Sequence, residues 1–111
     1  MQPKPLFWVG TSLKDIRALP DDARRELGFD LRSVQEGLTP RDWKPMRSIG
    51  VGVVEIRVRA GGAFRLMYIA TFPEGVYVLH VFQKKDRKTS SLDVEAAKVR
   101  LSYVRRARGE G

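Results

Sequence analysis

Near the start of the chain, apolar residues recur every three or four positions, which is the spacing of one face of an α-helix. A first set follows the run Ser12-Leu-Lys-Asp15, which resembles a capping box, and consists of Leu13, Ile16 and Leu19. A second set consists of Ala23, Leu27, Leu31, Val34 and Leu38. Pro20 suits the start of a helix and Gly37 suits its end, so the pattern predicts two helices joined at Pro20.

Farther along, apolar and polar residues alternate, and a period of two predicts strands. A short apolar run at residues 5–9 predicts a first strand, and a polar linker containing Pro40 and Pro45 follows the helices. Three more strands are expected at residues 53–59, 63–71 and 76–83, which glycine-rich and proline-containing turns separate. In the first of these three strands, Ile56 and Val58 are expected on one face, opposite Glu55, Arg57 and Arg59.

A last helix is expected from the run Ser90-Ser-Leu-Asp93, with a buried stripe of Leu92, Ala96, Val99 and Tyr103. The order strand, two helices, three strands and helix predicts an α+β fold, with helices on one face of a small antiparallel sheet. The sheet would comprise the N-terminal strand and the three-stranded meander. At this length we expect one domain over residues 1–111, in which residues 105–111 form a flexible basic tail.

Positive charge is concentrated toward the C-terminus. The chain carries 21 Lys and Arg against 13 Asp and Glu, a net charge of +8. Residues 84–108 hold 9 of these cations and 3 of the acids, whereas residues 1–83 hold 12 and 9. This asymmetry favours a polyanionic partner, above all nucleic acid, although a solvated basic segment would give the same count.

Several classes of protein are disfavoured by what the sequence lacks. There is no cysteine, and residues 1–9 contain no apolar run long enough for a signal peptide or membrane span, so we expect a cytoplasmic protein. His80 is the only histidine, and no nucleotide-binding loop, nucleophile elbow, zinc motif or calcium loop is present. We therefore expect no metal and no cofactor.

Cations gather on the strands of the predicted meander and at the exit of its third strand. Neighbouring strands lie about 5 Å apart, so cations on the same face can converge. The set is Arg57, Arg59, Arg65, Lys84, Lys85, Arg87 and Lys88. Arginine can bind two phosphate oxygens at once, and several cations suit the extra negative charge of a pentacoordinate phosphate. Such a site could cleave RNA without metal, because RNA supplies its own 2′-hydroxyl nucleophile and DNA does not.

Each of these residues also has a purely structural interpretation. Arg65 could form a salt bridge to Glu55 across the hairpin, and the other cations could be solvated strand residues. His80 could be a hydrogen-bonded packing residue or, because imidazole exchanges protons near neutral pH, a catalytic group. Tyr68 and Tyr103 are expected in the core, and Trp8 and Trp43 are interpreted as packing anchors.

Three segments, taken in order, resemble a known family. They are Val54-Glu-Ile-Arg57, Ala63-Phe-Arg-Leu-Met-Tyr68, and Val78-Leu-His-Val-Phe-Gln-Lys-Lys85 followed by Lys88-Thr89. The resemblance is to the phage-derived, HigB-like branch of the RelE/ParE toxin superfamily, and it extends over nearly the whole chain, including Lys14-Asp-Ile-Arg17. It implies a type II toxin that cleaves messenger RNA on the ribosome. The implied partner is a HigA-like helix-turn-helix antitoxin, which joins the toxin in a hetero-oligomer.

The resemblance also suggests roles for individual residues. It implies Arg57, Arg65, Lys84 and Lys85 as catalytic cations, to which His80 is added as a candidate proton carrier; Arg59, Arg87 and Lys88 are expected to bind RNA. The family often places a catalytic tyrosine or histidine near the C-terminus, where this chain offers Tyr103. Two other functions stay open, because one fold serves several activities: a ParE-like inhibitor of DNA gyrase and a non-catalytic RNA-binding module.

Overall fold

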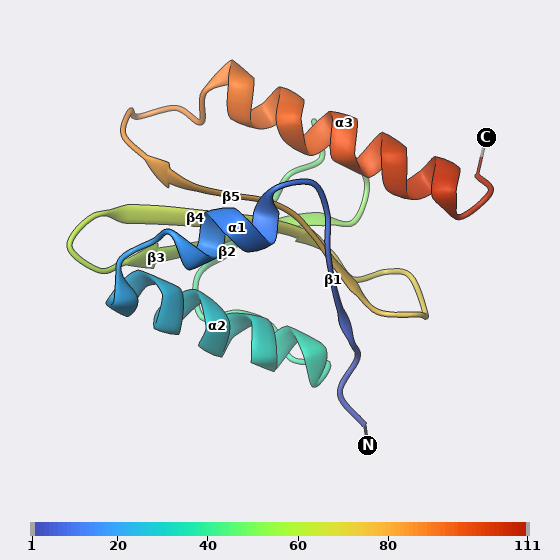
Figure 1. Cartoon of the computed structure of the whole chain (residues 1–111), viewed down its shortest axis with the longest axis horizontal. Coiled ribbons are helices and arrows are strands. Elements are labelled where there is room, and N and C mark those ends of the chain that lie inside the picture. The colour runs from blue at the N-terminus through green and yellow to red at the C-terminus, as the bar shows by residue number, and fades with distance from the viewer. Residues whose placement is uncertain (1, 111) are drawn as a thin grey trace.

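The computed structural model describes residues 2–110, which form a five-stranded sheet and three helices (Figure 1). In chain order the elements are β1 (Leu6–Trp8), α1 (Ser12–Arg17), α2 (Asp21–Gln35), β2 (Trp43–Pro45), β3 (Val53–Arg59), β4 (Ala63–Ile69), β5 (Val76–Lys84) and α3 (Ser91–Ala107). The predicted α+β class is confirmed, and β2 is an additional strand inside the expected linker. Within residues 2–110, no helix is long and apolar enough to cross a membrane.

The strands lie in the order β1-β5-β4-β3-β2. Strands β3, β4 and β5 form the predicted antiparallel meander, and β2 extends it in antiparallel pairing with β3. Strand β1 instead runs parallel to β5, with Leu6 opposite Val76 and Trp8 opposite Val78. The expectation of a wholly antiparallel sheet is therefore wrong at this edge. No hairpin joins β1 to β5, so no tight turn imposes an antiparallel direction.

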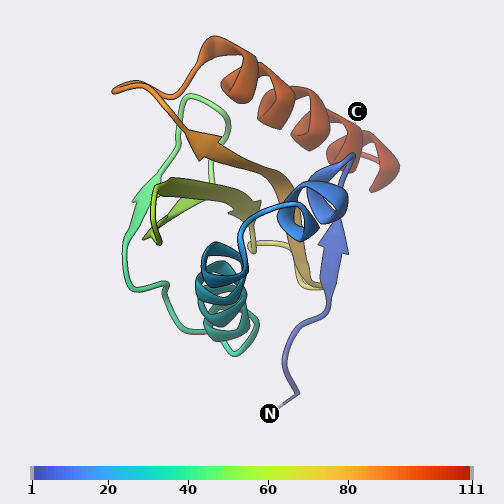
Figure 2. The ribbon, with the colours of Figure 1, turned by 60° about the vertical axis from the view of Figure 1, so that its left-hand side comes forward.

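Helices cover both faces of the sheet, with α1 and α2 on one side and α3 on the other (Figure 2). The expected packing on one face is therefore wrong. Strand β4 gives the physical reason, because every residue from 64 to 69 is buried. A strand covered on one side alternates between buried and exposed residues, whereas an unbroken buried run requires cover on both sides.

Helix α2 ends where expected and buries the predicted stripe against the sheet, except for Leu38, which follows the helix and is 64% exposed. The buried members are Ala23, Leu27, Leu31 and Val34. Gly37 follows the helix with a φ of 85°, a conformation that glycine adopts without steric penalty. Its N–H donates to the carbonyl oxygen of Val34 at 3.0 Å, while the N–H of Leu38 donates to that of Ser33 at 2.9 Å. These two bonds satisfy carbonyl groups at the helix end.

Helix α1 is anchored to the sheet through the serine that the sequence assigned to a capping box. Ser12 is completely buried, and its hydroxyl donates to the carbonyl oxygen of Val78 in β5 at 3.2 Å. The residue before the helix is Thr11, whose hydroxyl donates to Asp15 Oδ2 at 2.7 Å. The predicted capping box at Ser12 is therefore wrong, although the helix itself is confirmed.

Helix α3 faces the sheet with a different side from the one predicted. Its buried residues are Ala97, Leu101 and Val104. Leu92, Val99 and Tyr103 of the predicted stripe are 82%, 60% and 55% exposed, so that stripe and the assignment of Tyr103 to the core are wrong. The predicted start of the helix is confirmed, because the Ser90 hydroxyl accepts a hydrogen bond from the N–H of Asp93 at 3.1 Å.

The end of α3 extends into the segment that was expected to be a flexible tail. Residues 105–107 are helical, and the Arg108 guanidinium donates to Glu74 Oε2 at 2.5 Å. Arg108 also lies over the ring of Phe72, 3.8 Å from its centroid. These residues thus form part of the fold, while residue 111 lies outside the described residues.

Strand β5 contains one extra residue relative to β4. Met67 lies opposite His80 and Tyr68 lies opposite Val78, so Leu79 has no counterpart in the register. In such a β-bulge, two residues of one strand oppose a single residue of the other. Leu79 packs in the core beneath α3, and the next residue, His80, also reaches a side chain of α3. The bulge therefore gives this face of β5 two successive side chains.

Candidate functional site

The register of β3, β4 and β5 brings four of the predicted cations to one face of the sheet. Arg57 lies opposite Arg65 in the β3–β4 pair, and Arg59 lies opposite Ala63, which in turn lies opposite Lys84. Alternation along each strand places all of them on the side that α3 covers, toward the β3–β4 turn. We call this set, Arg57, Arg59, Arg65 and Lys84, the cation face.

A buried carboxylate lies between two of these arginines. Glu55 is 2% exposed, and its Oε1 atom lies 3.5 Å from Arg57 Nε and 3.6 Å from Arg65 Nε. The predicted contact between Arg65 and Glu55 is thus present. Neither distance is that of a good hydrogen bond. Among residues 2–110, Glu55 Oε2 and both Nε atoms have no hydrogen-bond partner, so the group is held by charge attraction.

Arg65 is the most enclosed member of the cation face. It is 8% exposed, and its Nη1 atom donates to the carbonyl oxygen of Phe64 at 3.1 Å. Burial lowers the pKa of Arg65 from its ordinary value, and the neighbouring charges of Arg57 and Arg59 lower it further. Glu55 and Asp42 act in the opposite direction. Arginine nevertheless remains charged in proteins, so Arg65 is a preorganised buried cation.

A pocket of about 480 Å³ opens beside this group, where β3 extends beyond β2. Arginines and acidic residues line most of it: Glu26, Asp30, Arg41, Asp42, Arg57, Val58, Arg59 and Arg65. The segment just before β2 is hydrogen-bonded to β3 here, because the N–H of Arg57 donates to the carbonyl oxygen of Asp42 at 2.9 Å. The pocket gives solvent and ligands access to Arg57 and Arg65.

One wall of this pocket is fixed by a buried aspartate that sequence reasoning missed. Asp30 of α2 is 1% exposed and accepts hydrogen bonds from Arg41 Nε at 3.0 Å and Arg41 Nη2 at 3.2 Å. The Arg41 guanidinium also lies 4.7 Å from the ring centroid of Phe29. These contacts hold the segment before β2 against α2. An aspartate on a predicted apolar stripe, three residues after Leu27, was the available signal.

The remaining predicted lysines gather beyond the end of β5. Lys84, Lys85 and Lys88 line a second pocket, of about 190 Å³, together with Phe82, Asp93 and neighbouring residues. Arg87 is exposed in the same loop and does not line this pocket. The structure thus divides the predicted site into the arginines beside Glu55 and a lysine group beyond the strand, with Lys84 in both the cation face and the lysine group. In residues 2–110, no three His, Asp or Glu side chains are grouped to hold a metal ion.

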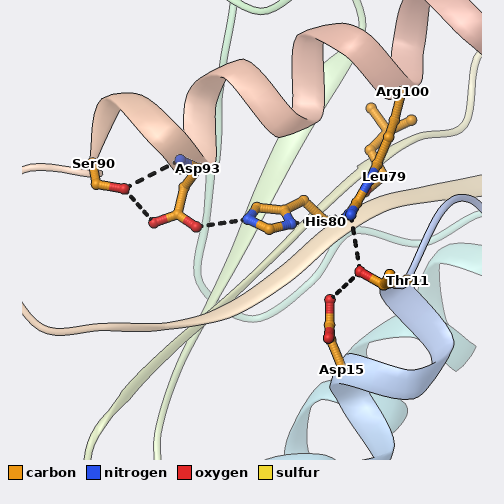
Figure 3. A network of polar contacts seen from close by, with 7 residues as sticks. All are labelled: Thr11, Asp15, Leu79, His80, Ser90, Asp93 and Arg100. Carbon is orange, nitrogen blue, oxygen red and sulfur yellow. Dashed lines mark hydrogen bonds and ion pairs between the residues drawn. The ribbon is translucent and has the colours of Figure 1, made fainter.

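His80 is held between two charged residues of α3 (Figure 3). Its Nε2 atom lies 2.7 Å from Asp93 Oδ1, and its Nδ1 atom lies 3.1 Å from Arg100 Nη1. Arginine can only donate, so Nδ1 accepts this hydrogen bond and the ring hydrogen is on Nε2, facing the carboxylate. The ring is 9% exposed and stacks on Phe82 with centroids 5.0 Å apart. Both nitrogens are therefore engaged in positioning the ring.

The partners of His80 are themselves anchored. Asp93 Oδ2 accepts from the Ser90 hydroxyl at 2.6 Å, while Arg100 donates to the carbonyl oxygen of Leu79 and to the Thr11 hydroxyl, each at 2.9 Å (Figure 3). Sequence reasoning missed Asp93 and Arg100 as partners of His80. Their spacing of seven places them on the same side of a helix, but nothing in the sequence places that side against His80.

The tyrosines lie away from the cation face. Tyr68 faces the opposite side of the sheet, 5% exposed in the core beneath α2. Burial, helped by the charge of Asp30, raises its pKa to about 12, so its hydroxyl is a poor proton donor or acceptor near neutral pH. Tyr103 is exposed on α3. Of the two tryptophans, Trp8 packs partly against the core as predicted, whereas Trp43 is 44% exposed.

Two comparisons with known proteins bear on identity. The sequence profile of the family described as phage derived protein Gp49-like (DUF891) matches residues 14–102. This match begins in α1 and ends in α3, so it includes the whole meander and every residue of the cation face. A search of curated proteins finds no match. Because the profile covers most of the chain, the protein belongs to the Gp49-like family of phage-derived proteins, which is a RelE-like toxin family.

Proposed function

We propose that this protein is the toxin of a type II toxin–antitoxin system, of the HigB-like branch, and that it cleaves messenger RNA. The observation that carries the proposal is the pairing of Arg57 with Arg65 beside an open pocket, with Lys84 on the same face. Membership of a RelE-like toxin family supports it independently. The site of action would be the ribosome in the cytoplasm, and a HigA-like helix-turn-helix antitoxin would neutralise the toxin in a hetero-oligomer.

In the proposed reaction, the RNA supplies the nucleophile. Its 2′-oxygen bonds to the adjacent phosphorus, the bond from phosphorus to the 5′-oxygen breaks, and the products are a 2′,3′-cyclic phosphate and a 5′-hydroxyl. One proton leaves the 2′-hydroxyl and one is added to the 5′-oxygen, so no oxidant, metal or cofactor is consumed. Guanidinium groups preorganised near the phosphate stabilise the negative charge that develops in the transition state.

Roles are assigned by position. Arg57 and Arg65 would bind the oxygens of the reacting phosphate, because they lie side by side at the pocket. Lys84 and Lys85 would lie beside the leaving 5′-oxygen, and the ammonium group of one of them would donate the proton that this oxygen gains. The outer cations Arg59, Arg87 and Lys88 would bind neighbouring phosphates, which position RNA without reading its sequence. His80 would support Phe82 and the lysine group rather than transfer a proton, because both of its ring nitrogens are engaged.

The test is induced expression of the wild type and of Arg57→Ala and Lys84→Ala, with 5′-end mapping of transcripts and growth curves. Arg25→Ala is the matched control, because Arg25 is an exposed arginine on α2. We expect each site variant to lower cleavage on the order of 10²-fold, as removal of one transition-state donor does. The control variant is expected to cleave as the wild type does.

Thermal unfolding of the purified variants separates loss of chemistry from loss of fold. New 5′ ends at wild-type levels in both site variants would show that the site is misassigned. Growth arrest with DNA-damage signalling and no new 5′ ends would instead favour gyrase inhibition.

A non-catalytic RNA-binding module is the second candidate, and the occupied nitrogens of His80 favour it. It predicts RNA affinity that depends on Arg57 without any strand cleavage or toxicity. Incubation of end-labelled RNA with the purified protein, with and without translating ribosomes, distinguishes the two functions. Cleavage products in either mixture would exclude a non-catalytic RNA-binding function.

A further inference from the structure

The outward side of α3 carries apolar residues that the fold does not use. Leu92, Val99 and Tyr103 are 82%, 60% and 55% exposed, and they recur at helical spacing along one line of the helix. A surface helix normally presents polar residues to water. Such an exposed apolar line marks an interaction surface more often than an accident of composition.

This line continues into a groove between α3 and the edge strand β1. The groove has a volume of about 610 Å³. Phe7 contributes to its β1 wall, and Val99 and Tyr103 form its α3 wall. Within residues 2–110, β1 is an edge strand whose one strand neighbour is β5 (Figure 2). The groove therefore lies along this edge of the sheet. We call this feature the α3 groove.

The charge around the α3 groove is positive. From Lys98 to Gly109 the chain contains five cations and no acidic residue. Arg108 is neutralised by Glu74, but Arg100 lines the groove and makes its hydrogen bonds to uncharged acceptors. Arg106 is exposed farther along the same helix. The acidic residues of α3, Asp93 and Glu95, both lie in its first half. An apolar floor with a basic rim selects an acidic partner.

We propose that the α3 groove binds an amphipathic, acidic helix of a protein partner. Apolar side chains of that helix, spaced three and four residues apart, would pack against Val99, Tyr103 and Phe7. Carboxylates on its flank would approach Arg100 and Arg106. The inference does not rest on RNA cleavage, because the groove contains none of the cation face and could bind a partner whether or not the chain is an enzyme.

Fluorescence anisotropy follows binding directly. A synthetic 16-residue helical peptide that carries a fluorescent label is titrated with the full chain. The peptide carries leucines at alternating spacings of three and four, and glutamates on the flanks. We expect the anisotropy to rise and saturate, because the bound peptide tumbles with the larger protein.

Two further peptides and two variants make the test specific. A peptide with lysine in place of glutamate, and one with serine in place of leucine, are expected not to bind. Tyr103→Ala is expected to lower the affinity for the acidic peptide about tenfold, as loss of an aromatic anchor does. Val51→Ala is the control, because Val51 is 81% exposed and lies outside the groove; it is expected to change the dissociation constant less than twofold.

The proposal is overturned by equal binding of the lysine peptide, by no rise in anisotropy at millimolar protein, or by unchanged affinity in Tyr103→Ala. Sedimentation of the wild type tests whether a second copy of this chain occupies the groove instead. Self-association that Tyr103→Ala abolishes would assign the groove to a second copy of this chain. Val99→Ala is expected to weaken peptide binding and to leave RNA cleavage unchanged, because Val99 lines the groove and lies outside the cation face. Failure here and failure of the proposed enzymatic activity are therefore distinguishable.

Discussion

Glu55 shows how one residue can organise a cationic site. Two arginines on one sheet face repel each other, and burying them adds a desolvation cost. The carboxylate between Arg57 and Arg65 offsets both effects, and both arginines line the pocket. Glu55 therefore acts through the arginines, and its expected role is to position them rather than to touch substrate.

Glu74 gives a residue-scale prediction about acid stability. Hydrogen bonds from Arg108, and a smaller one from Tyr77, lower the pKa of Glu74 to about 2. In an unfolded chain the pKa is the ordinary 4.5, so the folded state is stabilised above pH 4.5 and this stabilisation is lost as pH falls toward 2. Glu74→Gln is expected to be less stable than wild type at pH 7, and the two are expected to converge near pH 2.

Urea unfolding followed by circular dichroism at several pH values measures this difference. Glu36→Gln is the control, because Glu36 forms an exposed ion pair with Arg32 on a helix surface. A Glu74→Gln deficit that persists unchanged at pH 2 would contradict the proposed linkage to this carboxyl group.

The residues of the cation face were predictable, whereas the partners of His80 were not. Alternation along a strand fixes the face of Arg57, and a short turn fixes its neighbour Arg65, so local sequence is sufficient. Asp93 and Arg100 meet His80 only because α3 packs on β5. That contact depends on tertiary packing and on the bulge at Leu79, neither of which leaves a periodic signal.

At the scale of elements, α3 shows the limit of periodicity. Two apolar lines run along this helix at equivalent spacing: Leu92, Ala96, Val99, Tyr103 and Val94, Ala97, Leu101, Val104. Both satisfy the helical pattern, so spacing cannot decide which line faces the sheet. The second line is the buried one, and it packs against Ile49, Met67 and Leu79.

The two lines predict opposite outcomes for similar mutations. Leu101 is 3% exposed, so Leu101→Ala is expected to lower the free energy of unfolding by about 2–5 kcal/mol through lost burial and the cavity left behind. Leu92→Ala is expected to change it by less than about 0.5 kcal/mol, because Leu92 is already in water. Chemical denaturation at fixed pH compares the two, and equal losses would mean that α3 packs through both lines.

At the scale of the molecule, helices pack on both faces of the sheet, and three regions of the surface are therefore kept apart. Helix α2 covers one face, the cation face lies near the β3–β4 turn, and the α3 groove lies at the β1 edge. Substrate and protein partner would therefore contact different parts of the surface. The sheet and its meander could be predicted from sequence, but the division into surfaces follows from which side each helix takes.

The distribution of cations predicts how RNA affinity depends on salt. Each phosphate contact releases a counterion, and for single strands the slope of log K against log salt is about −0.7 per contact. Arg57→Ala is expected to make this negative slope shallower by about 0.7, and Arg25→Ala is expected to leave it unchanged. Fluorescence anisotropy with labelled single-stranded RNA at several salt concentrations gives the slopes. The same slope in all three proteins would place RNA outside the cation face.

The parallel pairing of β1 with β5 has a consequence for how the protein is made. Leu6 pairs with Val76, so β1 has no partner strand until β5 has been synthesised. Contacts between such distant residues form slowly, because a long loop must close first. The cation face also needs β5, the last strand. A growing chain therefore cannot assemble the cation face before β5 has been synthesised, and any toxic activity that depends on this face begins only after that point.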